Sequence, residues 1–266
     1  MRLRRAFPTK TDGYYTDIGA ATPINHSVTK FFYDQGWSGI NVEPMLDFYR
    51  LLEVDRPRDL NLNCGVSDKE GSLTLHEATG SIGRSTFEIE ACEGWKAYDG
   101  QEFVSREVPV VTLSQICEKH VDRTIDFLKI DVEGHEHFVV QGMDFRRWRP
   151  IVIVLEGSPE RWEHLLTSAD YLFAAEDGIN RYYVRTEDRH LIPKLAAPIS
   201  ILDDYKLFEH EQLVRELRAQ NEALLEQLSH YEDLGQRSAA LAIRARKIAH
   251  RVPGARRLIR WIAPVS

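Results

Sequence analysis

The chain has 266 residues, 43% of them hydrophobic and 28% charged, which is typical of a soluble globular protein with one α/β domain and an appendage. No apolar run of about 18 residues occurs, which excludes a membrane-spanning helix, and the basic start is not followed by the apolar region of a secretory signal. Three well-separated cysteines without a CxxC pair indicate buried thiols in a reducing compartment, not a disulfide framework or a zinc ribbon.

The net charge of −7 is unevenly distributed. Residues 235–266 contain eight Lys or Arg and no Asp or Glu, so the rest of the chain has 26 basic and 41 acidic residues, a net charge of −15. An acidic body argues against nucleic acid as its partner, and a basic end suggests contact with an anionic surface.

Short β-type runs alternate with amphipathic stretches from Tyr14 to about Arg185, which predicts stacked βαβ units. The predicted strands are Tyr14–Ile18, Gly39–Val42, Leu60–Asn63, Ile125–Ile130, Ile151–Leu155, Tyr171–Ala175 and Arg181–Val184. The predicted helices are Ile24–Gln35, Met45–Glu53, Leu113–Lys119, His135–Gly142 and Glu160–Ala169. Runs such as IVIVL are apolar at consecutive positions, as in strands covered on both faces. The expected fold is therefore a doubly wound, mostly parallel α/β sheet.

Between Leu73 and Val111 the alternation of strands and helices is interrupted, and the segment contains four separate glycines, at positions 80, 83, 94 and 100. We expect a loop-rich insertion here that covers a substrate site.

After Pro198 the pattern becomes that of one long helix, capped by Asp203 or Asp204 and ending near Leu234. In heptad register, Leu207, Val214, Asn221 and Leu228 fall at position a, and His210, Leu217, Leu224 and Tyr231 fall at position d. Leu at d with one Asn at a is typical of a parallel two-stranded coiled coil, and hence of a homodimer. The alternative is a single amphipathic helix packed on its own domain, which Leu213 and Leu225 favour by widening the apolar face.

The last segment alternates apolar with basic residues and is interrupted by Pro253-Gly254. One hypothesis is peripheral contact with an anionic membrane, with Leu258, Ile259, Trp261 and Ile262 inserted. The alternative is a solvated tail. The expected division is residues 1–202 for the α/β domain, 203–234 for the coiled-coil helix and 235–266 for the basic amphipathic tail.

The first motif with chemical content is Asp17-Ile18-Gly19-Ala20, at the end of the first predicted strand. Gly19 allows the backbone to approach a ligand at the carboxyl end of the strand. The later glycines of the GxGxxG dinucleotide motif are missing, which argues against an NAD-dependent oxidoreductase.

Glu43 ends the second predicted strand, where nucleoside-binding α/β folds hold ribose hydroxyls. Its two acceptor oxygens suit two adjacent hydroxyls. A helix N-terminal carboxylate before Pro44 is the alternative for Glu43 alone, and the neighbouring Gly19 turn favours the ribose interpretation.

The third motif is Phe127–Glu136, FLKIDVEGHE, which places one cation and several carboxylates at the end of an apolar strand. Lys129 and Asp131 are two residues apart in a strand and therefore point to the same face. Charges so close to a central strand are costly unless they are paired or functional, so this motif favours a functional cluster, with structural ion pairing as the alternative.

Taken together, DIGA, HSVTKFFYDQGWSGINVEP, FLKIDVEGHE and RPIVIVLEG resemble, in order and spacing, the FkbM-type methyltransferase family. The later DGINRYYV resembles a subgroup found alongside glycan-building enzymes, and the resemblance covers about Tyr14 to Tyr205. It implies a seven-stranded class I methyltransferase sheet, S-adenosylmethionine as methyl donor, and O-methylation of a sugar or polyketide hydroxyl. The family usually has Asn after DxGA, where this chain has Ala21.

The resemblance also implies roles for individual residues. Asp17, Gly19 and Ala20 would contact the donor, Glu43 its ribose, and Ser67 or Asp68 would lie near adenine. Asp131 is the first candidate for the catalytic base, Glu133 and His135 are the next, and Lys129 would orient the carboxylate or bind an anionic acceptor.

Other assignments remain open at this stage. Asp131, Glu133, His135, His137 and Glu156 include possible ligands for a divalent cation, but their spacing is not that of a metal motif, and we expect none. A non-catalytic scaffold that binds cofactor or glycan and recruits partners through the coiled coil is the alternative function. The expected whole is a cytoplasmic enzyme, peripheral on the inner face of the membrane, that methylates a lipid-linked or other surface glycan.

Overall fold

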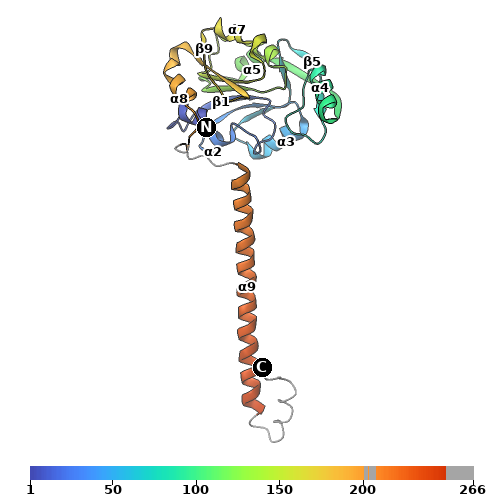
Figure 1. Cartoon of the computed structure of the whole chain (residues 1–266), viewed down its shortest axis with the longest axis vertical. Coiled ribbons are helices and arrows are strands. Elements are labelled where there is room, and N and C mark those ends of the chain that lie inside the picture. Colours follow the sequence, from blue (N-terminus) through green and yellow to red (C-terminus); the bar gives the residue numbers. More distant parts are fainter. Residues whose placement is uncertain (201–202, 204–207, 250–266) are drawn as a thin grey trace. The chain divides into compact units, whose positions relative to one another are not determined.

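The computed structural model describes residues 1–200, 203 and 208–249, and the chain divides into two units, Met1–Ser200 and Ile201–Ser266 (Figure 1). The strands are β1 (Tyr14–Ile18), β2 (Ser38–Val42), β3 (Leu60–Leu62), β4 (Gly65–Ser67), β5 (Gly71–Ala78), β6 (Phe103–Thr112), β7 (Phe127–Ile130), β8 (Val152–Glu156), β9 (Tyr171–Glu176) and β10 (Asn180–Arg185). The helices of the first unit are α1 (Arg2–Ala6), α2 (Lys30–Asp34), α3 (Leu46–Asp55), α4 (Ile89–Asp99), α5 (Leu113–His120), α6 (Glu136–Gln141), α7 (Glu163–Thr167) and α8 (Ile192–Ala196), with 3-10 turns η1 (Pro159–Arg161) and η2 (Thr186–Leu191).

A seven-stranded sheet in the order β3-β2-β1-β7-β8-β10-β9 forms the centre of the first unit. The neighbours from β3 to β8 pair in parallel, and β10 runs antiparallel between β8 and β9. The chain reverses its direction of travel across the sheet between β1 and β7, which places a crevice at the carboxyl ends of these strands. The predicted doubly wound, mostly parallel sheet is confirmed.

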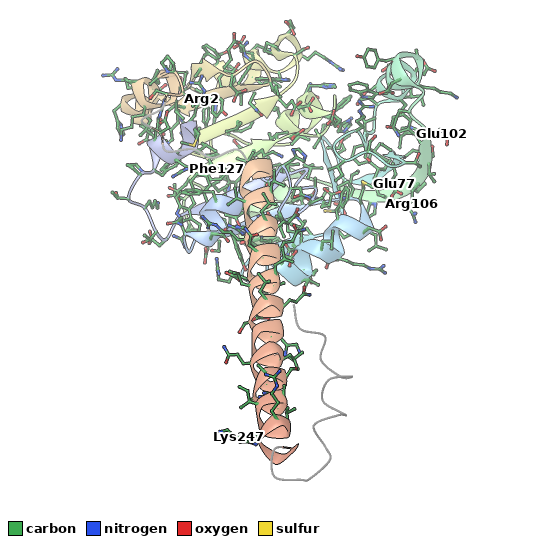
Figure 2. All side chains as sticks on the ribbon, turned by 60° about the horizontal axis from the view of Figure 1, so that its bottom comes forward. Arg2, Glu77, Glu102, Arg106, Phe127 and Lys247 are labelled. Carbon is green, nitrogen blue, oxygen red and sulfur yellow. The ribbon has the colours of Figure 1, made fainter. Side chains whose placement is uncertain are left out.

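Consecutive apolar residues in the central strands fill two separate cores. Phe127, labelled in Figure 2, packs on one face with Trp37 of the turn before β2 and with Val152 of β8. Leu128 and Ile153, the next residue of each strand, belong to the core on the other face. Helices α1, α2 and α8 contribute to the first core, and α5, α6 and α7 contribute to the second. The IVIVL run therefore has the two-sided burial that its composition predicts.

The predicted helix Ile24–Gln35 is wrong in its first half, because α2 begins only at Lys30. Ala21 and His26 have positive φ angles of 49° and 58°, which a right-handed helix does not allow. Thr22 Oγ1 donates to Asn25 O at 2.6 Å and closes this loop on itself. The predicted helix Glu160–Ala169 is likewise shorter and divided, into η1 and α7.

The insertion between Leu73 and Val111 is more regular than the loop-rich prediction. β5 and β6 form an antiparallel ribbon, paired from Gly71–Val110 to Ala78–Phe103, and β4 adds to it in parallel. Figure 2 shows Glu77 and Arg106 side by side on this ribbon, where Arg106 Nε lies 3.0 Å from Glu77 Oε1. The insertion glycines obscured the alternation because two of them, Gly80 and Gly83, lie in the segment between β5 and α4, and Gly94 and Gly100 lie within and directly after α4.

The second unit contains helix α9 (Phe208–Ala249), which continues past the expected end near Leu234. The residues after Leu234 are mostly Ala, Leu, Ile, Arg and Lys. All of these except the β-branched Ile are strong helix formers, so the helix continues past Gly235. Leu217, Leu224 and Leu228 of the heptad stripe are 50–58% exposed. Leu207 and the tail residues Pro253, Gly254, Leu258, Ile259, Trp261 and Ile262 lie outside the described residues, and so do the side chains of His210 and Tyr231.

The division at residues 202 and 234 and the coiled-coil dimer both remain predictions. Within the described part of the chain, no helix is at once long enough and apolar enough to cross a membrane.

Candidate functional site

One pocket opens where β1, β2 and β7 end, at the edge of the sheet that the sequence motifs share. From these strand ends it is lined by Ile18, Gly19, Ala21, Val42, Glu43, Pro44, Asp131, Val132 and Glu133. From the rest of the first unit it is lined by Met45, Phe48, Cys64, Gly65, Val66, Leu75, Gly83, Ser85 and Phe87. Most of this wall is apolar, and its few carboxylates come from the strand ends.

Beside the pocket, Lys129 lies between two carboxylates, as the spacing of the motif predicts. Its Nζ lies 3.2 Å from Asp17 Oδ1 and 3.1 Å from Asp131 Oδ2. It also donates to Gly19 O at 3.2 Å. Burial alone lowers the pKa of Lys129, but the two carboxylates outweigh burial and raise the pKa above its ordinary value. Lys129 is therefore a permanent cation that holds β1 and β7 together beneath the pocket.

Gly19 makes the close approach that the DIGA turn predicts. Its φ is +76°, and a Cβ at this position would lie only 1.9 Å from Asp131 O. Gly19 N donates to Val42 O at 3.0 Å, so the turn is fixed against β2. Only glycine fits where the ends of β1, β2 and β7 meet.

Glu43 lies in the pocket wall with both oxygens in use. Oε2 accepts from Ala21 N at 2.7 Å, and Oε1 accepts from Met45 N at 2.8 Å. Burial raises the pKa of Glu43 to about 7, against the lowering effect of these backbone donors. Each carboxylate oxygen has a second lone pair, so ligand hydroxyls can still be accepted at this position.

The loop after β7 carries Glu133 into the pocket wall. Glu133 has a positive φ of 53°, and Gly134 follows at 103°. Glu136 Oε1 accepts from Val132 N and Gly134 N, both at 3.1 Å, and thus holds the loop from beneath. Burial, then repulsion from Asp131, raises the pKa of Glu133 to about 8. At neutral pH the Glu133 carboxyl is therefore mostly protonated and able to donate.

Glu156, at the end of β8, belongs to the same acidic cluster, although its sequence position had suggested only a metal ligand. It hydrogen-bonds to Asp131, and burial followed by this neighbour raises its pKa. The signal for it was present, because IVIVLEG ends a central strand in an acid just as the strands before Glu43 and Asp131 do. Thr29 was also missed, and its Oγ1 donates to Asp17 Oδ2 at 3.1 Å.

The structure separates the predicted site residues into two groups. Gly19, Glu43, Asp131 and Glu133 line the pocket, while Asp17, Ala20, Lys129, Ser67, Asp68 and His135 do not. Asp17 and Lys129 support the pocket from behind. Ser67 is turned toward His135, with Ser67 Oγ 3.0 Å from His135 Nε2, and Cys64 to Val66 form that part of the wall instead.

The acidic cluster does not have the arrangement of a metal site in the part of the chain that the structure describes. Among the residues that the structure describes, no three His, Cys, Asp or Glu side chains come together as metal ligands. His137, one of the possible ligands, has its Nε2 2.7 Å from Arg161 Nη2 instead.

A doubly wound sheet with a pocket at the carboxyl ends of its central strands is typical of the open α/β proteins that bind their ligands in that crevice. Within this class, the family model of the methyltransferase FkbM domain matches residues 17–177, and the chain belongs to this family. The sheet is accordingly a class I methyltransferase-like fold.

Two solved structures are similar to this chain at low identity. One is the methyltransferase FkbM from Methylobacillus flagellatus KT, at 15% identity and a TM-score of 0.43, over 69% of this chain and 47% of that one. The other is a TehB-like SAM-dependent methyltransferase from Corynebacterium glutamicum ATCC 13032 Kitasato, at 9% identity and a TM-score of 0.35, over 69% of this chain and 86% of that one. The chain thus spans about half the length of the Methylobacillus protein. No curated protein matches it.

Proposed function

We propose that this protein is an S-adenosylmethionine-dependent O-methyltransferase that acts on a hydroxyl of a sugar or glycan. The observation that carries the proposal is that one pocket holds the Gly19 turn, the Glu43 carboxylate and the Asp131–Glu133 loop. These are the three sequence motifs that predict nucleoside binding and the position of the catalytic groups.

The residues present fit the methyl donor. The turn at Gly19 leaves a space that a Cβ would fill, so a ligand can approach the backbone there. Glu43 suits the ribose hydroxyls, and the apolar side chains of Met45, Phe48 and Phe87 suit a flat base. Near Asp131 and Glu133 the wall becomes acidic, which suits the positive charge of the donor.

When bound, S-adenosylmethionine would supply an electrophilic methyl group, whose bond to the sulfonium sulfur breaks as the thioether S-adenosylhomocysteine leaves. Asp131 is the proposed base, because it lines the pocket and is held in place by Lys129 at 3.1 Å. It accepts the proton of the acceptor hydroxyl as the new C–O bond forms, and Glu156 shares that proton through their hydrogen bond. Glu133, with its raised pKa, donates to the acceptor and orients it.

The direct test is methyl transfer to nucleotide sugars and lipid-linked glycans, with the product detected by mass. Asp131→Asn should lower turnover by about 10²–10⁴-fold while S-adenosylhomocysteine still binds. Glu118→Gln, a surface change on α5, is the control and should leave turnover unchanged. Near-normal turnover in Asp131→Asn would remove Asp131 from the role of base.

A second candidate function is a non-catalytic scaffold, which the exposed leucines of α9 favour. Such a protein would bind cofactor or glycan in the first unit and recruit partners through α9. Calorimetric titration with S-adenosylmethionine separates the two functions, since absence of binding leaves the scaffold as the better explanation.

We further propose that α9 forms a homodimer. Val214, Leu217, Leu224 and Leu228 make an exposed stripe of the heptad type, with Asn221 at a central position. Sedimentation equilibrium should give twice the mass of the chain, and Leu224→Asp should give the monomer mass. Glu226→Lys, on the same helix outside the stripe, should leave the dimer intact.

The basic end of the chain supports a peripheral location on the inner face of the membrane, in the cytoplasm. Arg237, Arg244, Arg246 and Lys247 all lie on α9, with Lys247 near its last turn (Figure 2), and no acid occurs after residue 234. Such a segment attracts anionic lipid by about 1 kcal/mol for each basic residue near the surface. Deletion of residues 236–266 should release the protein from vesicles that contain anionic lipid, and unchanged binding would contradict this location.

A further inference from the structure

The segment Thr86–Glu88 connects the insertion to the loop that carries Glu133. Thr86 Oγ1 donates to Glu133 O at 2.7 Å and accepts from Glu88 N at 3.0 Å. The backbone of Thr86 also pairs with His76 of β5, through N–O distances of 2.8 and 3.1 Å. Thr86 is 1% exposed, so these bonds lie out of reach of water. The segment is thus held on one side by the ribbon and on the other by the loop after β7.

A second connection is made by His135, which is buried and has partners at both ring nitrogens. Nδ1 lies 2.6 Å from Glu88 Oε1, and Nε2 lies 3.0 Å from Ser67 Oγ. Because a carboxylate only accepts, Nδ1 donates to Glu88, which leaves Nε2 of the neutral ring as an acceptor. The Ser67 hydroxyl has one proton and two acceptors in reach, His135 Nε2 at 3.0 Å and Asp68 Oδ1 at 3.3 Å, and the contact to His135 is the shorter one. Burial lowers the pKa of His135, which favours this neutral ring.

Glu88 is committed to this contact. It occupies the position before α4, yet its side chain makes no capping bond to that helix and turns to His135 instead. The Glu88 side chain therefore connects the start of α4 to the residue that precedes α6, and not to the first turn of its own helix.

Phe87 lies between these two connections and forms part of the pocket wall. Its ring centroid is 5.2 Å from that of His135. It also packs directly on β4, because a Cβ on Gly65 would lie 2.6 Å from Phe87 Cζ. Gly83 and Ser85, just before it in the chain, line the same wall. If Thr86 and Glu88 moved away, Phe87 would leave the pocket with them and open it.

We propose that Thr86, Glu88 and His135 form a latch that holds the insertion against the pocket and so sets how tightly and how long the methyl donor is retained. The latch rests on the proposed function, since it takes the donor to lie in this pocket. In this arrangement His135 and Glu88 are positioning residues, which act on the donor through the wall that they hold and not by moving a proton.

The order Ser67–His135–Glu88 is also that of a nucleophile, base and carboxylate in acyl-transfer enzymes. Ser67, however, is only 4% exposed and does not line the pocket, so no substrate carbonyl reaches its hydroxyl. The relay is therefore assigned to holding the two segments together.

The rate at which S-adenosylhomocysteine is released from the 266-residue chain tests the latch. This rate is measured by displacement with excess S-adenosylmethionine. Glu88→Ala and Thr86→Val should each speed release by about tenfold, which is the typical effect of losing one such hydrogen bond. Glu88→Gln keeps an acceptor for His135 and should lie between Glu88→Ala and the wild type. The matched control is Glu90→Gln, which removes a charge from the exposed first turn of the same helix and should leave release unchanged.

Amide hydrogen exchange of residues 79–88 in the ligand-free protein gives a second readout that does not depend on donor binding. Exchange should become faster in Glu88→Ala and Thr86→Val and stay at the wild-type rate in Glu90→Gln. Unchanged release in both latch variants, with the donor still bound, would overturn the latch and leave the proposed function standing. A wild-type protein that binds neither donor nor product would instead overturn the proposed function, and faster exchange in the latch variants would then show only that the segment is held there.

Discussion

Replacing Gly19 by alanine tests the junction of β1, β2 and β7 on which the site is built. The new Cβ would lie 1.9 Å from Asp131 O, and contacts of a Cβ under 3.0 Å are essentially never seen, so the backbone must separate by more than 1 Å. The left-handed φ of +76° adds about 1–2 kcal/mol for a residue with a Cβ, and overpacking of this kind costs typically about 1–3 kcal/mol. We expect Gly19→Ala to lower the free energy of unfolding by about 2–5 kcal/mol.

Urea denaturation measures this loss, and titration with S-adenosylhomocysteine measures its effect on the pocket, where Gly19 is part of the wall. The matched control is Gly71→Ala on β5, where a Cβ meets nothing within 4 Å and φ is ordinary. The control should change stability by less than about 0.5 kcal/mol. A Gly19→Ala protein that unfolds and binds as the wild type does would refute the close approach at this junction.

Further predictions concern single side chains and protons at the same edge of the sheet. Lys129→Met leaves buried Asp17 without its cation and should destabilise the protein by about 3 kcal/mol or more in thermal unfolding, whereas unchanged stability would contradict the ion pairs. Ala21→Asn places a residue that tolerates positive φ where Ala21 has +49°, and should raise stability by up to about 1 kcal/mol; a loss of stability would contradict the strain. The pKa of Glu133 is raised by burial to about 8, so its contribution to stability is present below pH 4.5 and is lost as the pH rises through 8. Glu133→Gln should therefore flatten the loss of stability between pH 5 and about 8.5, and an unaltered pH profile would count against the raised pKa. Binding of the cationic donor at pH 7 should release more protons than binding of its product, whose sulfur is uncharged, because a nearby cation lowers the pKa of a carboxyl group. Calorimetry in buffers of different ionisation enthalpy measures the number of protons released, and an equal number for donor and product would contradict this prediction.

The central sheet was predictable from the sequence because each of its strands is a short apolar run that ends at a charge or a turn residue. β1 was placed to the residue, and the other central strands were placed to within one or two. The ribbon of β5 and β6 was not predictable in this way, since Pro109 lies within β6 and the exposed run Ser105-Arg106-Glu107 breaks the alternation of apolar and polar residues. The loop before α2 was missed for a different reason, because the left-handed Ala21 is held by a residue that is distant in sequence, Glu43, whose Oε2 accepts from Ala21 N.

The site followed the same division. Gly19, Glu43, Asp131 and Glu133 could be placed together because the carboxyl ends of parallel strands meet at one edge. The orientation of Ser67 could not be predicted, since it depends on His135, which is distant in sequence and reaches β4 only through the fold. For the same reason the wall formed by Phe87 was expected only as an insertion without named contacts.

The balance of charge at this edge distinguishes a ligand site from a structural ion pair. Lys129 neutralises one of its neighbours, Asp17 or Asp131, and a purely structural pairing would need no further acid. Yet Glu133 and Glu156 crowd the same strand ends, and burial raises the pKa of each above its ordinary value. Crowding several buried carboxyl groups at one site is unfavourable, and a bound cation would reduce this cost by attracting them. A sulfonium with its ammonium group carries that positive charge, whereas an anionic acceptor would meet the Asp131 carboxylate in the same wall and increase the repulsion. The charge therefore supports a cationic donor in the pocket, and an acceptor that presents an uncharged hydroxyl to Asp131.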